Sequence, residues 1–532
     1  MLTDAGKRAV AVTAAVAAAL AVAGAAALGA PVAAAPAPPP EPRPAGLAWK
    51  PCPAKDPVEG ARLKGLQCAS LRVPLDHADP AGEQITLGLT RAPHTAPRSQ
   101  GVVLLNRGGP GAHGRDLPAF FTDSLPKRVA ASYDWIGFDP RGVGASEPEL
   151  VCDPKYQNPG RARPDAVPAS AAEEEAWKDG ARRYADDCAR RYGRILPHMG
   201  TADWARDMDA VRAALGQQKI NYFGYSYGTY LGAVYATMYP QRVRRMVLDS
   251  VVRPSGVWYG DNLDQNVAFE KRINAYFAWI ARHHAAYRLG GSGAEVAAAY
   301  ARVRAELKAK PLDGRIGPSE LDDVFLADGY GDYGWAAHAR ALSAYAVRHD
   351  PAPLRKAWQP PSRLEQNNYT VYSAVQCRDA AWPRDWGRWH ADSERLYRQG
   401  YRFETWSNTW YNAPCAFWGI PGGPPPRVEG GPALPPILMV QATEDAATPY
   451  PGALEMHGLF PTSRLLVQAG GHNHGVSLSD DKCVDGAVAA YLDAGRLPAS
   501  RPGPDQSCTA GPEPAAAKAA KADRAEQAAA HR

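Results

Sequence analysis

Short apolar runs alternate with longer, helix-like segments along most of the chain. Six of the runs, such as GVVLLN, read as strands that are buried on both faces. They are residues 101–106, 133–139, 220–226, 244–250, 436–442 and 463–469. Such runs, separated by helices, are typical of a parallel sheet covered on both sides. The pattern therefore predicts an α/β fold with a mostly parallel sheet.

A long segment separates the fourth of these strands from the fifth. Residues 254–431 are rich in Trp, Tyr and Arg and look largely helical. An insertion at this point would lie above the carboxyl ends of the strands, where open α/β sheets bind ligands. We therefore expect a helical cap or lid over residues 254–431, and the core in residues 49–253 and 432–508.

Both ends of the chain have the composition of segments outside the fold. Lys7 and Arg8 precede an uncharged, Ala-rich run and then small residues, the layout of a cleaved secretory signal peptide, which we place at 1–34. The alternative is a membrane-anchoring helix. We expect a Pro/Ala-rich linker over 35–48 and a disordered tail over 509–532.

The eight cysteines agree with export, because they are even in number and are not set in CxxC metal pairs. Eight cysteines allow 105 pairings. Short loops favour the pairing of neighbours as a hypothesis: Cys52 with Cys68, Cys152 with Cys188, Cys377 with Cys415 and Cys483 with Cys508.

A formal charge of +5 over 532 residues is mild, and no dense Lys/Arg stripe interleaved with aromatics is present. Nucleic acid is therefore not an expected partner. The sequence implies no metal or organic cofactor. We expect a secreted monomer with no stable membrane association after signal cleavage.

The clearest chemical motif is Gly224-Tyr225-Ser226-Tyr227-Gly228, a G-x-S-x-G between an apolar strand and an Ala-rich helical segment. This context is the one that a nucleophile elbow requires, with the serine on a sharp turn above the next helix. Without that context, the motif would be a chance match in a chain with 50 glycines. Ser226 is therefore the candidate nucleophile.

A serine hydroxyl needs a base and an orienting carboxylate, which follow it along the chain in this type of fold. Glu444 and Asp445 come just after the fifth predicted strand, and His472 and His474 come just after the sixth. The order fits, and the motif itself leaves open which member of each pair is used.

Acyl transfer also needs hydrogen-bond donors for the developing oxyanion. The segment LLNRGGPGAHG follows the first predicted strand, so the amides of Gly109 and Tyr227 are the candidate donors. The alternative for the glycines is a simple Gly-Pro loop.

Several of these segments together resemble the secreted tripeptidyl and prolyl tri/tetrapeptidyl aminopeptidases of actinomycetes, which are α/β-hydrolase serine peptidases related to proline iminopeptidase. They are NRGGPG, DWIGFDPRGVGASEP, GYSYGTYLG, AVQCRDAAWP, ATEDAATP and HGVSLSDDKCVDGAVAAYLDAGRLP. The similarity runs from about Cys52 to Cys508. The chain departs from the family at Arg107. The motif usually reads Asn-Pro-Gly-Gly-Pro-Gly in relatives, or His-Gly-Gly-Pro-Gly in proline iminopeptidases, and here Arg107 stands before the two glycines.

The resemblance favours one residue of each pair. The AATP after Asp445 resembles the Asp-x-x-Thr-Pro turn that follows the acid in relatives. Relatives follow the base with Gly and an apolar residue and have a cysteine nine or ten positions later, which matches His474 and Cys483. His472 then remains as a neighbour that shapes the loop or binds water.

An exopeptidase must recognise the free α-ammonium of its substrate, and a carboxylate is the simplest means. Asp379, in AVQCRDAAWP, is our candidate. Asp249, Asp328 and Asp332 are further options, and a solvated charge or a salt bridge is the alternative for each. Trp335 and Trp382 could line a pocket for proline or belong to the core of the lid.

Three functions compete at this point. The first is a secreted serine exopeptidase that releases tripeptides or tetrapeptides from peptide N-termini, with proline as one option at the cleaved position. The second is a secreted carboxylesterase or lipase with the same triad. The third is a non-enzymatic binding protein, against which an intact Ser, Asp and His in order argues. An epoxide hydrolase or dehalogenase would have an aspartate at position 226.

Overall fold

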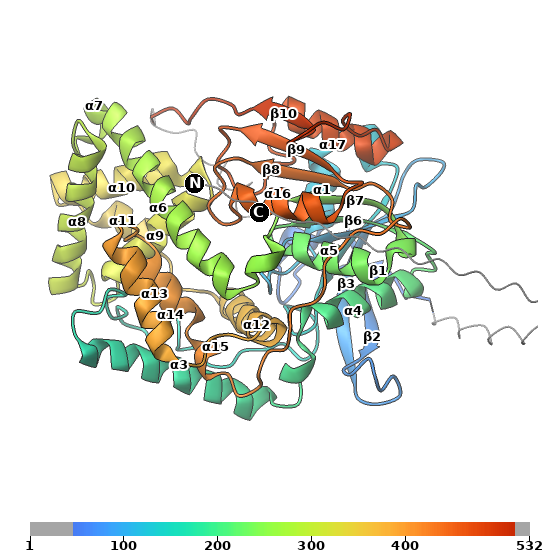
Figure 1. Ribbon diagram of the computed structural model, residues 1–532, viewed down its shortest axis with the longest axis horizontal. Coiled ribbons are helices and arrows are strands. Elements are labelled where there is room, and N and C mark those ends of the chain that lie inside the picture. The colour runs from blue at the N-terminus through green and yellow to red at the C-terminus, as the bar shows by residue number, and fades with distance from the viewer. Residues whose placement is uncertain (1–45, 517–532) are drawn as a thin grey trace, which may run out of the picture. The chain divides into compact units, whose positions relative to one another are not determined.

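The computed structural model describes residues 46–516, which contain a ten-stranded mixed sheet (Figure 1). The strand order is β1-β2-β3-β5-β4-β6-β7-β8-β9-β10. The bounds are β1 Lys50–Pro51, β2 Gln67–Pro74, β3 Gln84–Ala92, β4 Val102–Asn106, β5 Asp134–Asp139, β6 Ile220–Tyr225, β7 Val243–Asp249, β8 Leu438–Ala442, β9 Arg464–Ala469 and β10 Gln506–Thr509. Strands β1, β2, β3 and β5 pair antiparallel, and the pairs from β5 to β10 are parallel.

The predicted α/β class is confirmed, and the six predicted strands correspond to β4 through β9. Four strands were missed. β2 is half-buried along most of its length and therefore lacks a continuous apolar run, and β1 and β10 have only two and four residues. A sheet that is mostly parallel places the carboxyl ends of its strands, and the loops that follow them, at one edge.

Helices cover both faces of the sheet. α4 (Thr201–Ala214), α5 (Tyr227–Met238) and α16 (Tyr450–Leu459) share one hydrophobic cluster with alternate residues of the strands. α1 (Leu117–Ser124), α2 (Lys127–Ala130) and α17 (Lys482–Ala494) share the cluster on the opposite face. The alternation of Val102 and Leu104 with Val103 and Leu105 between the two clusters shows why β4 is apolar throughout.

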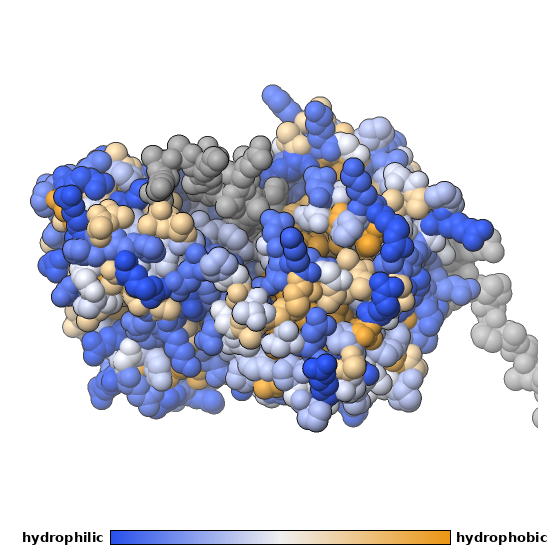
Figure 2. All heavy atoms as spheres, turned by 90° about the horizontal axis from the view of Figure 1, so that it is seen from above, coloured by the Kyte–Doolittle hydropathy of each residue, from blue (hydrophilic) through white to orange (hydrophobic). Residues whose placement is uncertain are grey.

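A helical insertion lies between β7 and β8, at the expected place in the chain (Figure 1). Its helices are α6 Tyr259–Arg282, α7 His284–Tyr287, α8 Gly293–Ala309, α9 Pro318–Tyr330, α10 Trp335–Arg348, α11 Ala352–Ala357, α12 Arg363–Asp379, α13 Trp386–Arg398, α14 Thr405–Asn412 and α15 Pro414–Phe417. Helices α6 to α10 enclose an aromatic cluster of their own. The face of the insertion seen in Figure 2 is mainly hydrophilic, because these apolar side chains point inward.

One helix that we had placed in the core lies with the insertion instead. α3 (Ala171–Tyr192), between β5 and α4, packs against α14 and α15 (Figure 1). The Tyr184 hydroxyl is 2.9 Å from the Thr370 hydroxyl of α12. The wall of the insertion is therefore built from two separate parts of the chain.

The predicted tail starts too early. Thr509 ends β10, and the Pro514 carbonyl accepts a hydrogen bond of 2.9 Å from Trp279 Nε1 in α6. The signal-peptide prediction, most of the linker, and residues 517–532 lie outside the described residues. Within residues 46–516, no helix has the length and apolarity to cross a bilayer.

The eight cysteines form four disulfide bonds between sequence neighbours: Cys52–Cys68, Cys152–Cys188, Cys377–Cys415 and Cys483–Cys508. This is the pairing that short loops favoured. Cys377–Cys415 joins α12 to α15 in the insertion, whereas Cys483–Cys508 joins α17 to β10 in the core.

Candidate active site

Ser226 occupies a sharp turn between β6 and α5, with φ of 56° and ψ of −126°. Non-glycine residues rarely adopt a positive φ. Glycines permit the turn, since a Cβ on Gly224 would lie 2.5 Å from the Gly228 carbonyl oxygen. The Ser226 amide donates to the Asp249 carbonyl at the end of β7, 2.9 Å away. The motif therefore has the strand, strained serine and helix of a nucleophile elbow.

Asp445 and His474 are direct neighbours. His474 Nδ1 lies 2.8 Å from Asp445 Oδ2 and 3.1 Å from Oδ1. Asp445 Oδ1 also accepts hydrogen bonds from the amides of Ala447 and Thr448, and the Thr448 hydroxyl donates to Oδ2. The carboxylate is thus held in place by its own turn, which leaves it oriented toward the imidazole. Glu444, the competing acid, is exposed.

The electrostatic environment of His474 suits a base. Burial alone would lower the pKa of its imidazole, but the charge of Asp445, the hydrogen bond to it and the charge of Asp249 raise that pKa above 6.5. With Nδ1 donating to Asp445, the unprotonated Nε2 is the atom that can accept a proton.

Asp249 holds the loop that carries His474. It is fully buried, and its two oxygens accept hydrogen bonds from the amides of Val476 and Ser477. The Gly475 amide donates to the Ser250 hydroxyl, 2.7 Å away. One of the acids considered for ammonium binding is therefore a support for the histidine loop.

His472 points toward the insertion rather than toward Asp445. Its Nε2 lies 3.1 Å from Asp332 Oδ2, and its ring stacks on Trp335 with centroids 5.4 Å apart. The backbone amide of His474 donates to the Tyr330 carbonyl at the end of α9. The loop thus joins core and insertion, with one histidine facing each.

The two candidate oxyanion donors come from two neighbouring segments. Tyr227 is the first residue of α5, and Gly109 lies in the loop after β4. That loop passes against the elbow, because a Cβ on Gly108 would lie 2.6 Å from the Tyr225 carbonyl oxygen and 3.1 Å from the Tyr227 amide nitrogen. Arg107, the departure from the family motif, donates a hydrogen bond of 2.8 Å to Asp116 Oδ1.

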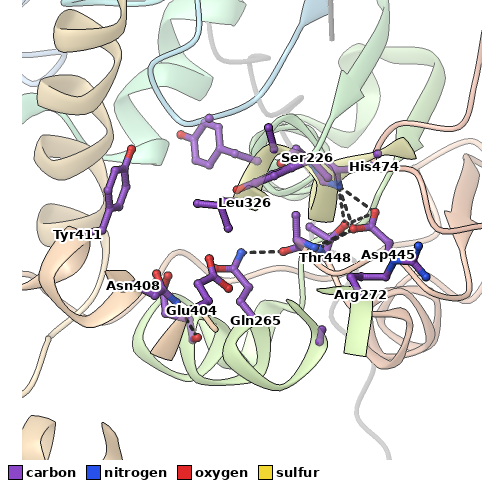
Figure 3. A pocket seen from close by; sticks show the side chains of 18 of the residues that line it. Ser226, Gln265, Arg272, Leu326, Glu404, Asn408, Tyr411, Asp445, Thr448 and His474 are labelled. Carbon is purple, nitrogen blue, oxygen red and sulfur yellow. Dashed lines mark hydrogen bonds and ion pairs between the residues drawn. The ribbon is translucent and has the colours of Figure 1, made fainter. Parts of the chain in front are cut away.

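A cavity of about 1210 Å³ contains Ser226, His474 and Asp445 in its wall (Figure 3). The loops after β4, β6, β8 and β9 line one part of it, and α6, α9, α12 and α14 of the insertion line much of the remainder. Gln265 of α6 also donates to the Ala447 carbonyl beside Asp445, which ties the insertion to the acid turn. The candidate nucleophile therefore lies in a space that core and insertion enclose together.

Asp379 does not line this cavity. It is buried, and it accepts hydrogen bonds from the Thr201 amide, the Thr201 hydroxyl and Trp258 Nε1. Burial raises the pKa of its carboxyl to about 6. Asp379 thus caps the start of α4, and it has no open side for a substrate. Trp335 and Trp382 are core residues of the insertion and its surroundings, outside the cavity wall.

Sequence reasoning missed a carboxylate that does face the cavity. Glu404 precedes the first residue of α14 and contributes to the lining. Its local sequence, YRFETWSN, carries no motif that would have indicated it. Within the described residues, no group of three or more His, Cys, Asp or Glu side chains could hold a metal ion.

The fold and the elbow define the class of the protein. Residues 101–475 match the family described as the alpha/beta hydrolase fold, and the chain belongs to that family. Over 469 residues, covering 86% of each chain, it is 44% identical to the tripeptidyl aminopeptidase of Streptomyces lividans. The protein belongs to the family of these peptidases and is a serine hydrolase.

More distant relatives bear other names. The chain is 31% identical over 475 residues to serine protease Hip1 of Mycobacterium tuberculosis, covering 85% of this chain and 89% of the relative. It is 30% identical over 454 residues to carboxylesterase B of the same species, covering 82% and 86%.

Proposed function

We propose that the protein is a secreted serine exopeptidase that removes tripeptides, or tetrapeptides, from the N-termini of peptides. The observation that carries this proposal is the position of Ser226 in a cavity walled by α6, α9, α12 and α14. A space enclosed in this way accepts a chain end more readily than the middle of a folded protein. The name of the 44% identical relative supports the same product length.

The proposed reaction uses the residues in the following roles. Ser226 Oγ attacks the carbonyl of the cleaved bond while His474 Nε2 takes its proton, and Asp445 orients the imidazole and stabilises its charged form. The amides of Gly109 and Tyr227 stabilise the oxyanion. His474 then protonates the leaving amine, and water hydrolyses the acyl-enzyme in the same way.

Export, oligomeric state and residue preference belong to the same proposal. Four disulfide bonds suit an oxidising compartment outside the cytoplasm. The hydrophilic face of the insertion suits a monomer. The aromatic side chain of Tyr330 in the cavity wall, whose ring lies 5.6 Å from that of His474, suits an apolar residue such as proline near the cleaved bond.

A carboxylesterase is the second candidate, favoured by the name of the 30% identical relative. Purified protein is incubated with a tripeptidyl p-nitroanilide, its N-acetylated counterpart and a short acyl ester. Hydrolysis of the free-amine anilide alone is the expected result. Equal hydrolysis of the acetylated anilide would eliminate exopeptidase action, and hydrolysis of only the ester would favour the esterase.

A further inference from the structure

Glu404 presents a buried, unpartnered carboxylate to the cavity. The residue is only 5% exposed, yet its side chain makes no hydrogen bond with any of the described residues, and no Lys, Arg or His of that part of the chain lies within 4.0 Å of it. Its backbone carbonyl, in contrast, accepts a hydrogen bond from the Asn408 amide. A carboxylate without a partner is costly to bury, so such a group indicates that a ligand supplies the partner.

The surroundings of Glu404 are rich in acceptors and aromatic rings. Gln376 of α12 also lines the cavity, and its Oε1 is buried without a partner. Tyr372 lies one turn before Gln376 on α12; its hydroxyl donates to Asn412 Oδ1 at 2.9 Å, and it is close enough to feel the charge of Glu404. Two acceptors without donors, beside aromatic rings, complement a cation that carries several N–H groups.

The ionisation of Glu404 agrees with this reading. Burial alone raises the pKa of its carboxyl to about 8, with no neighbouring charge opposing it. The phenols of Tyr330 on α9 and Tyr372 on α12 are close enough to feel its charge, and both stay neutral because their pKa values are raised. A cationic group bound here would stabilise the carboxylate.

We propose that Glu404, together with Gln376 Oε1, binds the terminal α-ammonium group of the peptide substrate. This assignment rests on the proposed exopeptidase function. It names the residues that would make the protein require a substrate with a free N-terminus. It replaces Asp379, whose oxygens are already occupied by Thr201 and Trp258.

An ammonium subsite at Glu404 would set how many residues separate the N-terminus of the substrate from Ser226. In Figure 3 it lies on the side of the cavity with Asn408 and Tyr411, while Ser226 and His474 lie on the other side, beyond Leu326. An extended peptide advances about 3.3 Å per residue, so three residues span roughly 10 Å. With its ammonium held at Glu404, a substrate would present one particular peptide bond to Ser226.

The test compares two substrates that differ only in the amine: Ala-Ala-Pro p-nitroanilide and propionyl-Ala-Pro p-nitroanilide. The variants are Glu404→Gln, which keeps the shape of the side chain, and Asp264→Asn as the matched control. Asp264 also lines the cavity, but it is half-exposed and pairs with Arg253 at 3.0 Å. Thermal unfolding checks the fold, and Glu404→Gln should not lower stability because it replaces a buried carboxyl that has no hydrogen-bond partner with an amide of the same shape.

The wild type and Asp264→Asn are expected to prefer the free-amine substrate by about 100-fold in kcat/KM, since a buried pair of opposite charges discriminates at this level. Glu404→Gln should lose most of that preference, with kcat/KM for the propionyl substrate unchanged. A folded Glu404→Gln variant that keeps the wild-type preference would overturn the subsite and leave the exopeptidase proposal intact. A wild type without any preference would refute both.

The binding affinity of unreactive ligands provides a second test, which does not depend on turnover. In the Ser226→Ala background, calorimetry with the tripeptide Ala-Ala-Pro and with propionyl-Ala-Pro measures affinity alone. Only the free-amine tripeptide should bind tightly, and the added Glu404→Gln change should weaken it to the level of the propionyl compound. Equal affinity of the two compounds for the Ser226→Ala protein would contradict the proposal.

Discussion

His472 Nε2 lies 3.1 Å from Asp332 Oδ2, in the insertion, so the two histidines of the GHNHG segment have different partners. His474 faces Asp445 and the cavity. We expect His474→Ala to reduce kcat on the order of 10⁶-fold, as removal of a base does in serine hydrolases. His472→Ala should cost about tenfold or less, because a partly exposed ion pair contributes up to about 1 kcal/mol. Steady-state kinetics of both variants checks this, and the reverse order would move the base by two residues.

Asp445→Asn should leave the fold intact and lower kcat by about 10⁴-fold, because the amide would stabilise the wrong tautomer of the imidazole. Glu444→Gln is the control, since Glu444 is exposed and the carboxylate that contacts His474 is that of Asp445. Comparable kinetics for the two variants would argue against Asp445 as the orienting acid.

The pH dependence of kcat/KM follows from the contact between His474 and Asp445. His474 must be neutral to accept a proton, and its pKa is raised above 6.5, so kcat/KM should fall as the pH drops through that raised pKa. In Asp445→Asn the opposing charge is gone, and the residual activity should have its acid limb at lower pH. An acid limb that stays in place in this variant would assign the titration to another group.

Asp249 should act as a positioning residue. Asp249→Ala would leave the buried amides of Val476 and Ser477 without acceptors, at a cost of about 1–3 kcal/mol each. We expect a lower free energy of unfolding, measured in urea, together with a reduced kcat and a nearly unchanged KM. Asp249→Asn, which keeps one acceptor, should be intermediate. Wild-type kcat in Asp249→Ala would show that the loop holds its place without this support.

The disulfide bonds offer a test of the insertion. Cys377 follows Gln376, which lines the cavity, so Cys377→Ser with Cys415→Ser should lower stability by about 2–5 kcal/mol and raise KM. The matched pair Cys483→Ser with Cys508→Ser, in the core, should lower stability without changing KM. Equal KM values in the two double variants would show that the Cys377–Cys415 bond does not contribute to substrate binding.

The sheet was largely predictable because β4 through β9 are apolar on both faces. Ser226, Asp445 and His474 could be proposed for a similar reason, since each comes directly after one of these strands. β2 was missed because most of its residues are only half-buried, which removes the continuous apolar run.

The substrate-binding residues could not be predicted in the same way. Asp379 attracted attention through a family motif, but tertiary packing gives it three donors. Glu404 differs from a surface glutamate because the folded chain buries it and gives its side chain neither a hydrogen-bond donor nor a cation. That property depends on how α9, α12 and α14 of the insertion pack together, so no local sequence pattern predicts it.

The most direct measurement is the mass spectrum of a defined ten-residue peptide after incubation with the purified protein. We expect stepwise loss of tripeptides from the N-terminus, no cleavage of the N-acetylated peptide, and no products with the Ser226→Ala variant. Release of single residues, or cleavage of the acetylated peptide at internal bonds, would contradict this expectation.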